Sequence, residues 1–233
     1  ATLIGWHEDF NMLYLKQTPG QEKALAYLNA LSGSDSKLRL GGHSKGGNFA
    51  IYAGMYCKSS IRDRITFIYN NDGPGFSKDV VESSAYQNLL PVIMTIVPES
   101  SVVGRLFEHQ EEYIVVKSEN KGLKQHDAMS WEVLGNHFVH AVTPANQSLL
   151  ANQAIHEWIA LIPREKRKEI VEAVFQILDA AGIQTVDDFL TLKLKDIRTI
   201  IQTKKKLPRE TSDSISDAAF LLIKIMIKTF SAS

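Results

Sequence analysis

The sequence predicts an α/β fold, in which helices cover a mostly parallel β-sheet and a helical region follows. Three observations predict it. Short apolar runs rich in β-branched residues alternate with segments of helical periodicity, as in parallel sheets that are covered on both faces. A glycine-rich turn, residues 41–47 (GGHSKGG), joins the first run to an apolar helical segment. After about residue 145 only helical periodicity remains.

The elements of the predicted sheet follow one another along the first part of the chain. Residues 20–32 place leucines at helical spacing, and residues 48–57 (NFAIYAGMYC) predict a second, buried helix. The segment NNDGPGF, residues 70–76, is a dense turn signal after the second strand. The predicted strands are residues 38–40 (LRL), 65–69 (ITFIY), 89–97 (LLPVIMTIV) and 113–116 (YIVV).

The rest of the chain predicts a helical region. Residues 146–185 and 215–231 have helical periodicity, and the basic segment KKKLPRE, residues 204–210, is predicted to be a solvated loop. We therefore expect a core domain over residues 1–145 and a helical tail or small subdomain over residues 146–233. The apolar stretch AAFLLIKIMIKTF is expected to be buried against the domain. The alternative is a face that binds a protein partner or a second copy of the chain.

Composition excludes several classes of function. Lys plus Arg and Asp plus Glu number 26 each, so the net charge gives no case for nucleic acid or an anionic membrane as a partner. The chain contains no run of ~18 apolar residues, so the sequence predicts no membrane span. The opening ATLIGWHEDFNM lacks the pattern of a signal peptide, and the single Cys57 cannot form an internal disulfide. We therefore expect a cytoplasmic protein with a buried, inert thiol.

Gly42-His43-Ser44-Lys45-Gly46 is a G-x-S-x-G sequence between a predicted strand and a predicted helix. In such a turn glycines are expected at both flanks, because side chains there would collide, and the strained backbone lifts the serine hydroxyl to the carboxyl edge of the sheet. The N-terminus of the following helix points its N–H groups at the same place. Ser44 is therefore a candidate nucleophile, and a glycine-rich turn with an idle serine is the alternative.

A nucleophilic serine needs a base and an orienting acid. His126 lies in a loop just after the last predicted strand, where this architecture supplies its base, and His43 is expected to point away from Ser44. Asp72 and Glu99 each follow a strand in the interval. We prefer Asp72, whose loop D-G-P-G is stiff, although an aspartate there can also bond its own turn. Glu99 stays open as the alternative acid.

The sequence gives no sign of a metal or cofactor. No cluster of His, Cys, Asp or Glu has ligand spacing, and His7-Glu8-Asp9-Phe10 lacks the second histidine of a zinc motif. The glycine-rich turn also lacks the spacing of a phosphate-binding loop. We therefore expect chemistry that needs neither a metal nor a cofactor.

Four segments resemble the uncharacterised bacterial Mbeg-like proteins, relatives of the class 3 lipases in the α/β-hydrolase superfamily. They are GGHSKGGNFAIYA, NNDGPGF, IVPESSVVGRLFEHQEEYIVVKS and KGLKQHDAMSWEV. The resemblance covers residues 1–145 and continues more loosely through the tail. It implies an α/β-hydrolase-like fold with a Ser-Asp-His triad, in which Ser44 matches the nucleophile and His126 the base. Asp72 matches the acid of pancreatic-type lipases, and His109 a histidine with a structural role.

The chain departs from the class 3 lipases in two places. Those lipases carry their acid one strand later, in a D-x-V-P motif, and the matching stretch here is Ser101-Val102-Val103-Gly104. The opening of the chain resembles the segment that follows an oxyanion-hole strand. We therefore expect the N-terminal strands of the core to lie upstream, the sheet edge near residues 38–40 to be exposed, and the backbone N–H of Lys45 to be one of two oxyanion donors.

The function expected from these residues is the hydrolysis of an acyl ester, as in a lipase or esterase. Without a second oxyanion donor we expect turnover to be low, and adding the upstream segment should raise it. A non-catalytic scaffold or interaction protein with a hydrolase fold is the alternative. Lipids, other acyl esters and thioesters all fit as substrates. The apolar residues expected to line an acyl pocket, or else to belong to the core, are Phe76, Val102, Val103, Leu106, Phe107 and Trp131.

Overall fold

The computed structural model describes residues 2–31, 35–185, 188 and 191–231. Contacts within the chain divide it into two compact units. We call residues 19–156 the sheet unit, and residues 1–18 together with 157–233 the helical unit. The first residues of the chain, which the sequence analysis groups with the core domain, thus contact the C-terminal helices.

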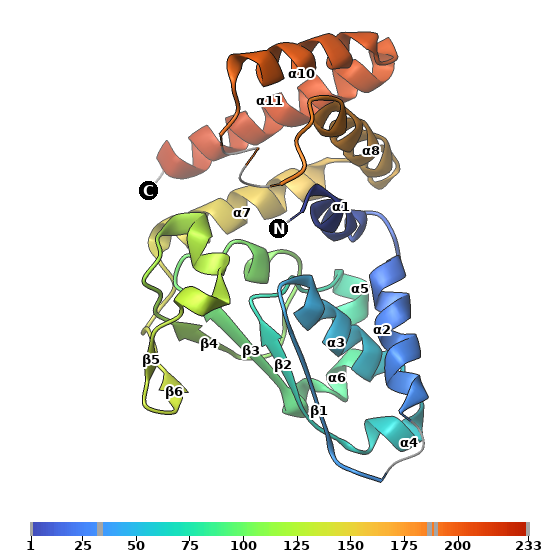
Figure 1. The fold of residues 1–233 in the computed structure, drawn as a ribbon, viewed down its shortest axis with the longest axis vertical. Coiled ribbons are helices and arrows are strands. Elements are labelled where there is room, and N and C mark those ends of the chain that lie inside the picture. Colours follow the sequence, from blue (N-terminus) through green and yellow to red (C-terminus); the bar gives the residue numbers. More distant parts are fainter. Residues whose placement is uncertain (1, 32–34, 186–187, 189–190, 232–233) are drawn as a thin grey trace. The chain divides into compact units, whose positions relative to one another are not determined.

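The sheet unit contains a four-stranded parallel sheet with the strand order β1-β2-β3-β4 (Figure 1). This confirms the predicted α/β class and the parallel sheet. In the described sheet β1 has one neighbour, β2, so the expected edge near residues 38–40 carries no further strand. The strands are β1 (Leu38–His43), β2 (Ile65–Asn71), β3 (Ile93–Pro98) and β4 (Tyr113–Val116).

Helix α3 (Lys45–Tyr56) packs on β1 and β2, and α2 (Pro19–Ala30) packs on α3. Both helices were predicted from the sequence. Their core cluster includes Ile51, Ile68 and Tyr86, which are almost completely buried. Burying each such side chain stabilises the fold by about 1.5–3 kcal/mol. Three further short helices complete this part of the unit, namely α4 (Ser59–Arg62), α5 (Lys78–Val81) and α6 (Ser84–Gln87).

The segment after β4 builds a second, smaller core cluster around Ile96, Val116 and Trp131. Its small antiparallel hairpin, β5 (Val133–Leu134) and β6 (His137–Phe138), was not predicted, because strands of two residues have no recognisable period. The sheet unit also contains short 3₁₀ helices, namely η1 (Leu90–Val92), η2 (Val103–Arg105), η3 (Gly122–His126) and η4 (Ala128–Ser130).

The strands β1 and β2 extend to His43 and Asn71, beyond the predicted ends at residues 40 and 69, and the predicted start of the third strand is wrong. The run LLPVIMTIV does not form a strand throughout, because residues 90–92 form the 3₁₀ helix η1 and β3 begins at residue 93. Pro91 has no N–H group to donate to a ladder, which accounts for the later start.

The helical unit confirms the predicted helical C-terminal region. It consists of α1 (Leu3–Asn11), the end of α7 (Asn146–Leu161), α8 (Arg164–Ala180), α10 (Leu194–Lys206) and α11 (Arg209–Ser231). Helix α8 contacts α1, α10 and α11. The stretch AAFLLIKIMIKTF lies in α11, where Ala218 and Ile225 are buried but Phe220 and Ile227 are exposed. The expected burial therefore holds for one face of the helix.

The prediction of a loop at KKKLPRE is wrong. Three lysines of this segment form the last turn of α10, and α11 begins at Arg209. Lysine is a good helix former, and its charge is favourable at a helix C-terminus. Pro208 keeps Leu207 in an extended conformation, with φ −67° and ψ 157°, so the break between the helices is confined to these two residues.

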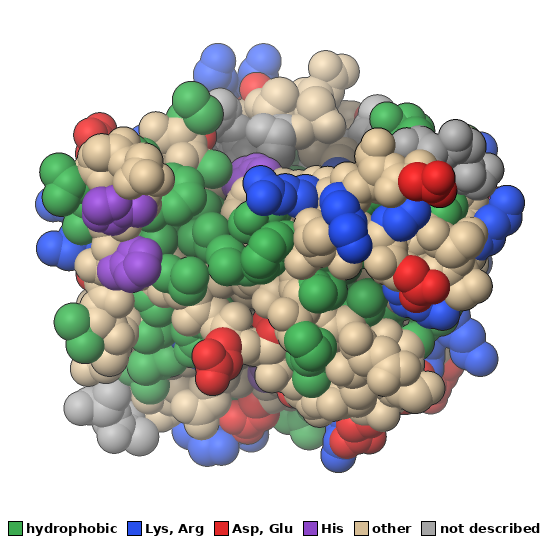
Figure 2. All heavy atoms as spheres, turned by 90° about the horizontal axis from the view of Figure 1, so that it is seen from below, with side chains coloured by type: hydrophobic (Ala, Val, Ile, Leu, Met, Phe, Trp, Pro, Cys, Tyr) green, Lys and Arg blue, Asp and Glu red, His purple; other side chains and the backbone are tan. Residues whose placement is uncertain are grey.

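On the face shown in Figure 2, basic and acidic side chains are interspersed with hydrophobic ones. In the described part of the chain, no helix has the length and apolar character needed to cross a membrane.

A buried carboxylate connects α6, β3 and the loop before β4 in the sheet unit. Glu111 accepts hydrogen bonds from Tyr86 Oη of α6, from Thr95 Oγ1 of β3 (2.7 Å) and from His109 Nδ1 (2.9 Å). Burial alone would raise the pKa of Glu111, but these donors, His109 first, outweigh burial and lower it to about 2. Burial and the charge of Glu111 raise the pKa of Tyr86, which therefore remains a donor. His109 thus has a structural contact, in line with the role that the resemblance implies.

We predict that Glu111→Gln lowers the free energy of unfolding at pH 7 by about 2–4 kcal/mol, because it leaves buried donors poorly matched. The pKa of Glu111 is lower in the folded than in the unfolded chain, so its contribution is complete above about pH 4.5 and is lost as the pH falls toward 2. Urea denaturation at several pH values measures this. Glu112→Gln, at the exposed neighbour, should change little. An equal loss in both variants would contradict the prediction.

Candidate active site

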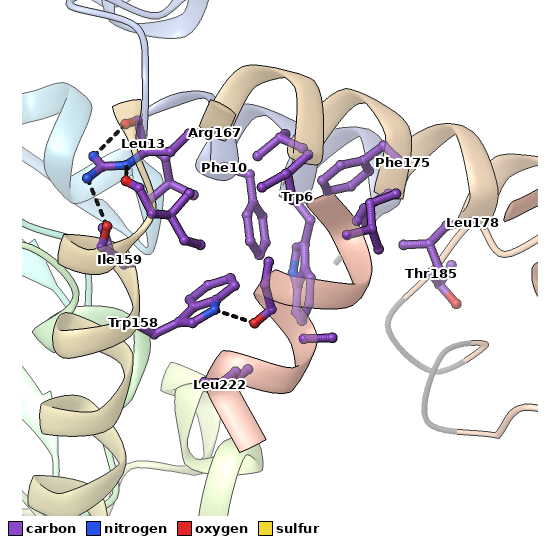
Figure 3. A pocket seen from close by; sticks show the side chains of 17 residues that line it. Trp6, Phe10, Leu13, Trp158, Ile159, Arg167, Phe175, Leu178, Thr185 and Leu222 are labelled. Atoms are coloured by element: carbon purple, nitrogen blue, oxygen red, sulfur yellow. Dashed lines mark hydrogen bonds between the residues drawn. The ribbon is translucent and has the colours of Figure 1, made fainter. Parts of the chain in front are cut away.

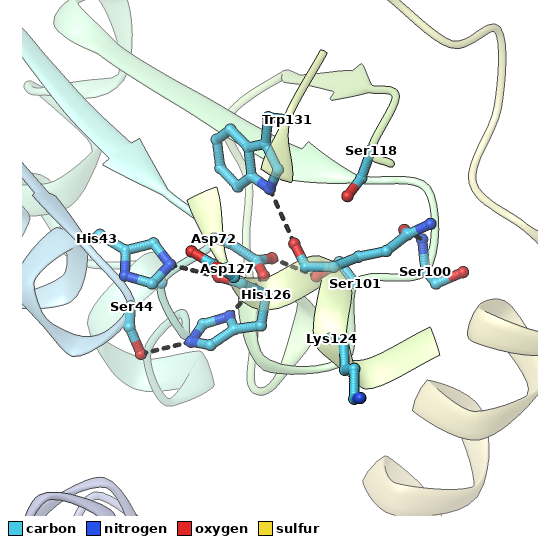
Figure 4. A network of polar contacts seen from close by, with 12 residues as sticks. His43, Ser44, Asp72, Ser100, Ser101, Ser118, Lys124, His126, Asp127 and Trp131 are labelled. Carbon is cyan, nitrogen blue, oxygen red and sulfur yellow. Dashed lines mark hydrogen bonds and ion pairs between the residues drawn. The ribbon is translucent and has the colours of Figure 1, made fainter. Parts of the chain in front are cut away.

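Three polar side chains meet at the carboxyl edge of the parallel sheet (Figure 4). Ser44 directly follows β1, Asp72 directly follows β2, and His126 ends η3, which comes after β4. The backbone N–H of Ser44 bonds Asn71 O (2.9 Å) and that of Asp72 bonds Ile96 O (2.8 Å), so each residue stays anchored to the neighbouring strand.

These side chains form one continuous chain of hydrogen bonds. His126 Nε2 lies 2.9 Å from Ser44 Oγ, and His126 Nδ1 lies 2.7 Å from Asp72 Oδ2. The Asp72 carboxylate is fully buried, whereas 29% of the His126 side chain is exposed. A carboxylate accepts but does not donate, so Nδ1 carries the proton toward Asp72 and Nε2 is left to accept the hydroxyl proton of Ser44. The arrangement can remove that proton when the hydroxyl reacts.

The turn that presents Ser44 is strained. Ser44 has φ 58° and ψ −136°, a conformation that residues with a side chain rarely adopt. A Cβ on Gly42 would lie 2.2 Å from the backbone carbon of Gly46, so only glycine fits at position 42. A Cβ on Gly46 would meet nothing within 4 Å. The expectation that both glycines are needed for space therefore holds for Gly42 and is wrong for Gly46.

Asp72 is held in place by its own loop and by a neighbouring one. Its φ of 53° is positive, and its Oδ1 accepts a hydrogen bond from Ser101 Oγ (2.5 Å). The side chain that hydrogen-bonds the backbone of this turn is that of Asn70 rather than Asp72. Its Oδ1 accepts a hydrogen bond from the N–H of Gly73 (3.0 Å). Asn48 of α3 donates to Pro74 O (3.1 Å) and also to the next carbonyl of the loop. Both Asp72 oxygens are thus available to His126 and Ser101.

Ser101 links Asp72 to helix α7. Its carbonyl accepts hydrogen bonds from Ser148 Oγ (2.5 Å) and Asn152 Nδ2 (3.0 Å), and all three residues are buried. Gly104 in the same loop lies against the carboxylate, since a Cβ there would be 2.2 Å from Asp72 Oδ1. These contacts were not predicted from the sequence, because the residues are far apart in the chain and belong to no local motif.

His43 fixes the segment that carries His126. Its side chain points away from the Ser44 hydroxyl, as expected, and its Nε2 lies 2.6 Å from the carbonyl oxygen of His126. The two imidazole rings are 4.6 Å apart. Gln125, the residue before His126, is also held in place. Its carbonyl oxygen accepts a hydrogen bond from Trp131 Nε1 (2.8 Å), and its side-chain Oε1 accepts one from the N–H of Ser100 (2.7 Å). His43 is a positioning residue that sequence reasoning missed.

Comparison with known proteins identifies the family. A family model described as Mbeg1-like matches residues 1–176, about three quarters of the chain. The chain belongs to the Mbeg1-like family. No curated protein and no solved structure matches it.

The other residues considered from the sequence lie outside the hydrogen-bonded chain in this member of the Mbeg1-like family. Both ring nitrogens of His126 are taken by Ser44 and Asp72, so none is left for Glu99. The backbone of Glu99 instead bonds those of Val116 and Ala145. Lys45, proposed from the sequence as an oxyanion donor, is the first residue of α3. Among the described residues, no three His, Cys, Asp or Glu side chains are grouped so that they could hold a metal ion.

We predict opposite outcomes for the two glycines of the turn in this Mbeg1-like protein. Gly42→Ala forces the backbone at Gly46 to move and should lower the free energy of unfolding by about 3 kcal/mol or more. Gly46→Ala is the matched control, since it adds the same methyl group in open space within a helix and should be neutral or slightly stabilising. Denaturant titration of both variants measures the difference. Similar losses in the two would refute the steric account.

Proposed function

We propose that the protein is a serine hydrolase that cleaves an acyl ester, with an α/β-hydrolase fold related to the class 3 lipases. The observation that carries this proposal is the hydrogen-bond chain from Ser44 Oγ through His126 to Asp72. The strained backbone of Ser44 between a strand and a helix supports it, since this is how hydrolases of that fold present their nucleophile. In this proposal Ser44 is the nucleophile, His126 the base and Asp72 the acid.

The reaction follows from the direction of the hydrogen bonds. Ser44 Oγ attacks the acyl carbon while its proton passes to His126 Nε2, and Asp72 stabilises the imidazolium that forms. The imidazolium then gives that proton to the oxygen of the leaving alcohol, and an acyl-serine ester remains. Water attacks this ester as His126 accepts its proton, which passes back to Ser44 Oγ when the carboxylic acid leaves. No metal or cofactor takes part in these steps.

The developing negative charge on the acyl oxygen needs hydrogen-bond donors. We assign one donor to the backbone N–H of Lys45, which begins α3 at the carboxyl edge of the sheet, with the dipole of α3 adding to it. A single donor of this kind contributes about 100- to 1000-fold to turnover. The backbone group serves this role, so the side chain at position 45 can vary.

The surroundings of the site support an apolar acyl group. The loop that carries Ser101 exposes Val102, Val103, Leu106 and Phe107 in part. Two other candidates for an acyl pocket, Phe76 and Trp131, are buried in the core. Partly exposed apolar side chains beside Asp72 suit a hydrocarbon chain better than a polar substrate.

A second candidate function is that of an interaction protein. The exposed face of α11 favours it, because Phe220, Ile223 and Ile227 are each more than half exposed. Apolar side chains at this spacing on one helix are typical of a surface that contacts another protein. A protein partner or a second copy could bind there whether or not the protein is an enzyme.

We predict that a fluorophosphonate probe labels the wild-type protein and that Ser44→Ala abolishes the labelling, because the probe reacts with an activated serine hydroxyl. Intact-mass measurement detects the adduct. Ser100→Ala, next to the loop residue that bonds Asp72, is the control and should be labelled like the wild type. An unlabelled wild type, or labelling that survives in Ser44→Ala, would remove the basis for the hydrolase.

We predict a graded loss of activity along the hydrogen-bond chain. Asp72→Asn should lower kcat for a chromogenic acyl ester by about 10³–10⁴-fold, because the imidazole loses its charged partner. Ser101→Ala removes only one donor to Asp72 and should cost about tenfold. Glu99→Gln is the matched control and should change kcat by less than about twofold. If Glu99→Gln lost more activity than Asp72→Asn, the acid would be assigned to the wrong residue.

A further inference from the structure

Helices α10 and α11 of the helical unit carry large apolar side chains on their outer faces. We call six of these side chains the exposed stripe, and each of them is between 40% and 76% exposed. Along each helix they follow one another at intervals of three and four positions, so they lie on one side of that helix. They are Leu194, Ile197 and Ile201 of α10 and Phe220, Ile223 and Ile227 of α11.

One hydrogen bond shows that the two halves of the exposed stripe adjoin. Lys204 Nζ of α10 donates to Ser216 Oγ of α11 (2.6 Å), so these two positions face each other. The stripe residues of α10 lie three, seven and ten positions before Lys204, and those of α11 lie four, seven and eleven positions after Ser216. Each set therefore continues the row of the bonded residue along its own helix. Since α10 and α11 are antiparallel (Figure 1), both rows run the same way from this bond.

The opposite side of α11 belongs to the interior of the helical unit. Ala218 and Leu222 line an apolar cavity of about 440 Å³ there, together with residues of α1, α7 and α8 (Figure 3). Ala218 O also accepts a hydrogen bond from Trp158 Nε1 (2.7 Å). Among the described residues that line this cavity, none belongs to the exposed stripe. Helix α11 thus packs through one face and presents the other to the outside.

Basic side chains border the exposed stripe on both helices. Arg198, Lys205 and Lys224 each lie four positions after a stripe residue. A step of four positions turns by about 40° around a helix, so each of these cations lies directly beside the stripe. In both helices this turn leads away from the contact between Lys204 and Ser216. The exposed stripe therefore has cations along its two outer borders.

The basic borders have few acidic neighbours. Helix α10 has five basic residues and a single acidic one, and from residue 218 onward α11 has two lysines and no acidic residue. Lys228 pairs with Glu157 (3.3 Å). Among the residues that the structure describes, no carboxylate lies within ion-pair distance of Arg198, Lys205 or Lys224. The balanced net charge of the whole chain conceals this local positive charge.

We propose that the exposed stripe binds the surface of an anionic lipid bilayer. Its apolar side chains enter the interface, and the cations beside them contact the lipid head groups. Helices that lie in a membrane interface combine Phe and aliphatic residues on one face with Lys and Arg on the polar face. A second copy of the chain would fit less well, because a two-fold interface sets the patch against itself and basic borders against basic borders. The proposal concerns the helical unit and does not rest on the proposed function.

Flotation of the full-length protein with lipid vesicles tests the proposal. Vesicles of phosphatidylcholine with about 30% phosphatidylserine should bind the protein at least about tenfold more tightly than vesicles of phosphatidylcholine alone. Raising the NaCl concentration to about 0.5 M should weaken this binding, because salt screens the attraction between the cations and the anionic head groups.

A first variant tests the basic borders. Arg198→Gln, Lys205→Gln and Lys224→Gln together should weaken partitioning to the anionic vesicles about 100-fold, since each basic residue near such a surface contributes about fivefold. The matched control removes the same number of charges at exposed lysines of the sheet unit and should bind like the wild type. It combines Lys23→Gln, Lys37→Gln and Lys58→Gln.

A second variant tests the apolar contact. Phe220→Ser with Ile227→Ser should weaken binding to the anionic vesicles at least about tenfold, and both positions are exposed, so the helical unit should still fold. Circular dichroism checks the fold. Val142→Ser, at a side chain of the sheet unit that is 98% exposed, is the control and should bind like the wild type.

Four outcomes would overturn the proposal. They are no flotation with anionic vesicles, equal binding to neutral ones, unchanged binding in the triple glutamine variant of the borders, and unchanged binding in Phe220→Ser with Ile227→Ser. Sedimentation of the wild type should show a monomer. A dimer that dissociates in Phe220→Ser with Ile227→Ser would instead assign the exposed stripe to a second copy of the chain.

Discussion

The tightness of the turn between β1 and α3 is the constraint on which the candidate site depends. With no side chain at Gly42, the backbone at Gly46 can close over it, and Ser44 is forced into a positive φ. That strained conformation is stable only because the elements on either side are fixed, β1 by its pairing with β2 and α3 by its packing on the sheet. Core packing thus offsets the backbone strain at Ser44, whose hydroxyl is hydrogen-bonded to the imidazole of His126.

The buried carboxylate of Asp72 imposes a second condition, because a charge removed from water needs hydrogen bonds from every side. His126 and Ser101 supply them. In the proposed relation to the class 3 lipases, the stretch Ser101-Val102-Val103-Gly104 matches the segment where those lipases carry their own acid. Since Ser101 Oγ lies 2.5 Å from Asp72 Oδ1, an aspartate at position 101 would set two carboxylates against each other. A serine there is compatible with an acid at position 72, and Gly104 leaves the space for it.

Local patterns predicted much of this arrangement. The strands, the helix after Gly42 and the positions of Ser44, Asp72 and His126 follow from short apolar runs and turn residues, because parallel strands bring their carboxyl ends to one edge. What could not be predicted depends on contacts between distant segments. The bond from His43 to the His126 carbonyl and the link from Ser101 to α7 have no periodic or motif signal. The grouping of residues 1–18 with the C-terminal helices likewise arises from tertiary packing alone.

The hydrogen bonds of Arg167 also hold together segments that line an apolar cavity of the helical unit. An apolar cavity in a small helical assembly would collapse if its walls could approach one another, since contact between them is favourable. Arg167 of α8 bonds carbonyls near the end of α7 and the carbonyl of Leu13 just after α1. These bonds fix the spacing of three walls from one end without filling the space between them. The hydrogen bonds of Arg167 therefore join three segments of the helical unit at one end of the cavity.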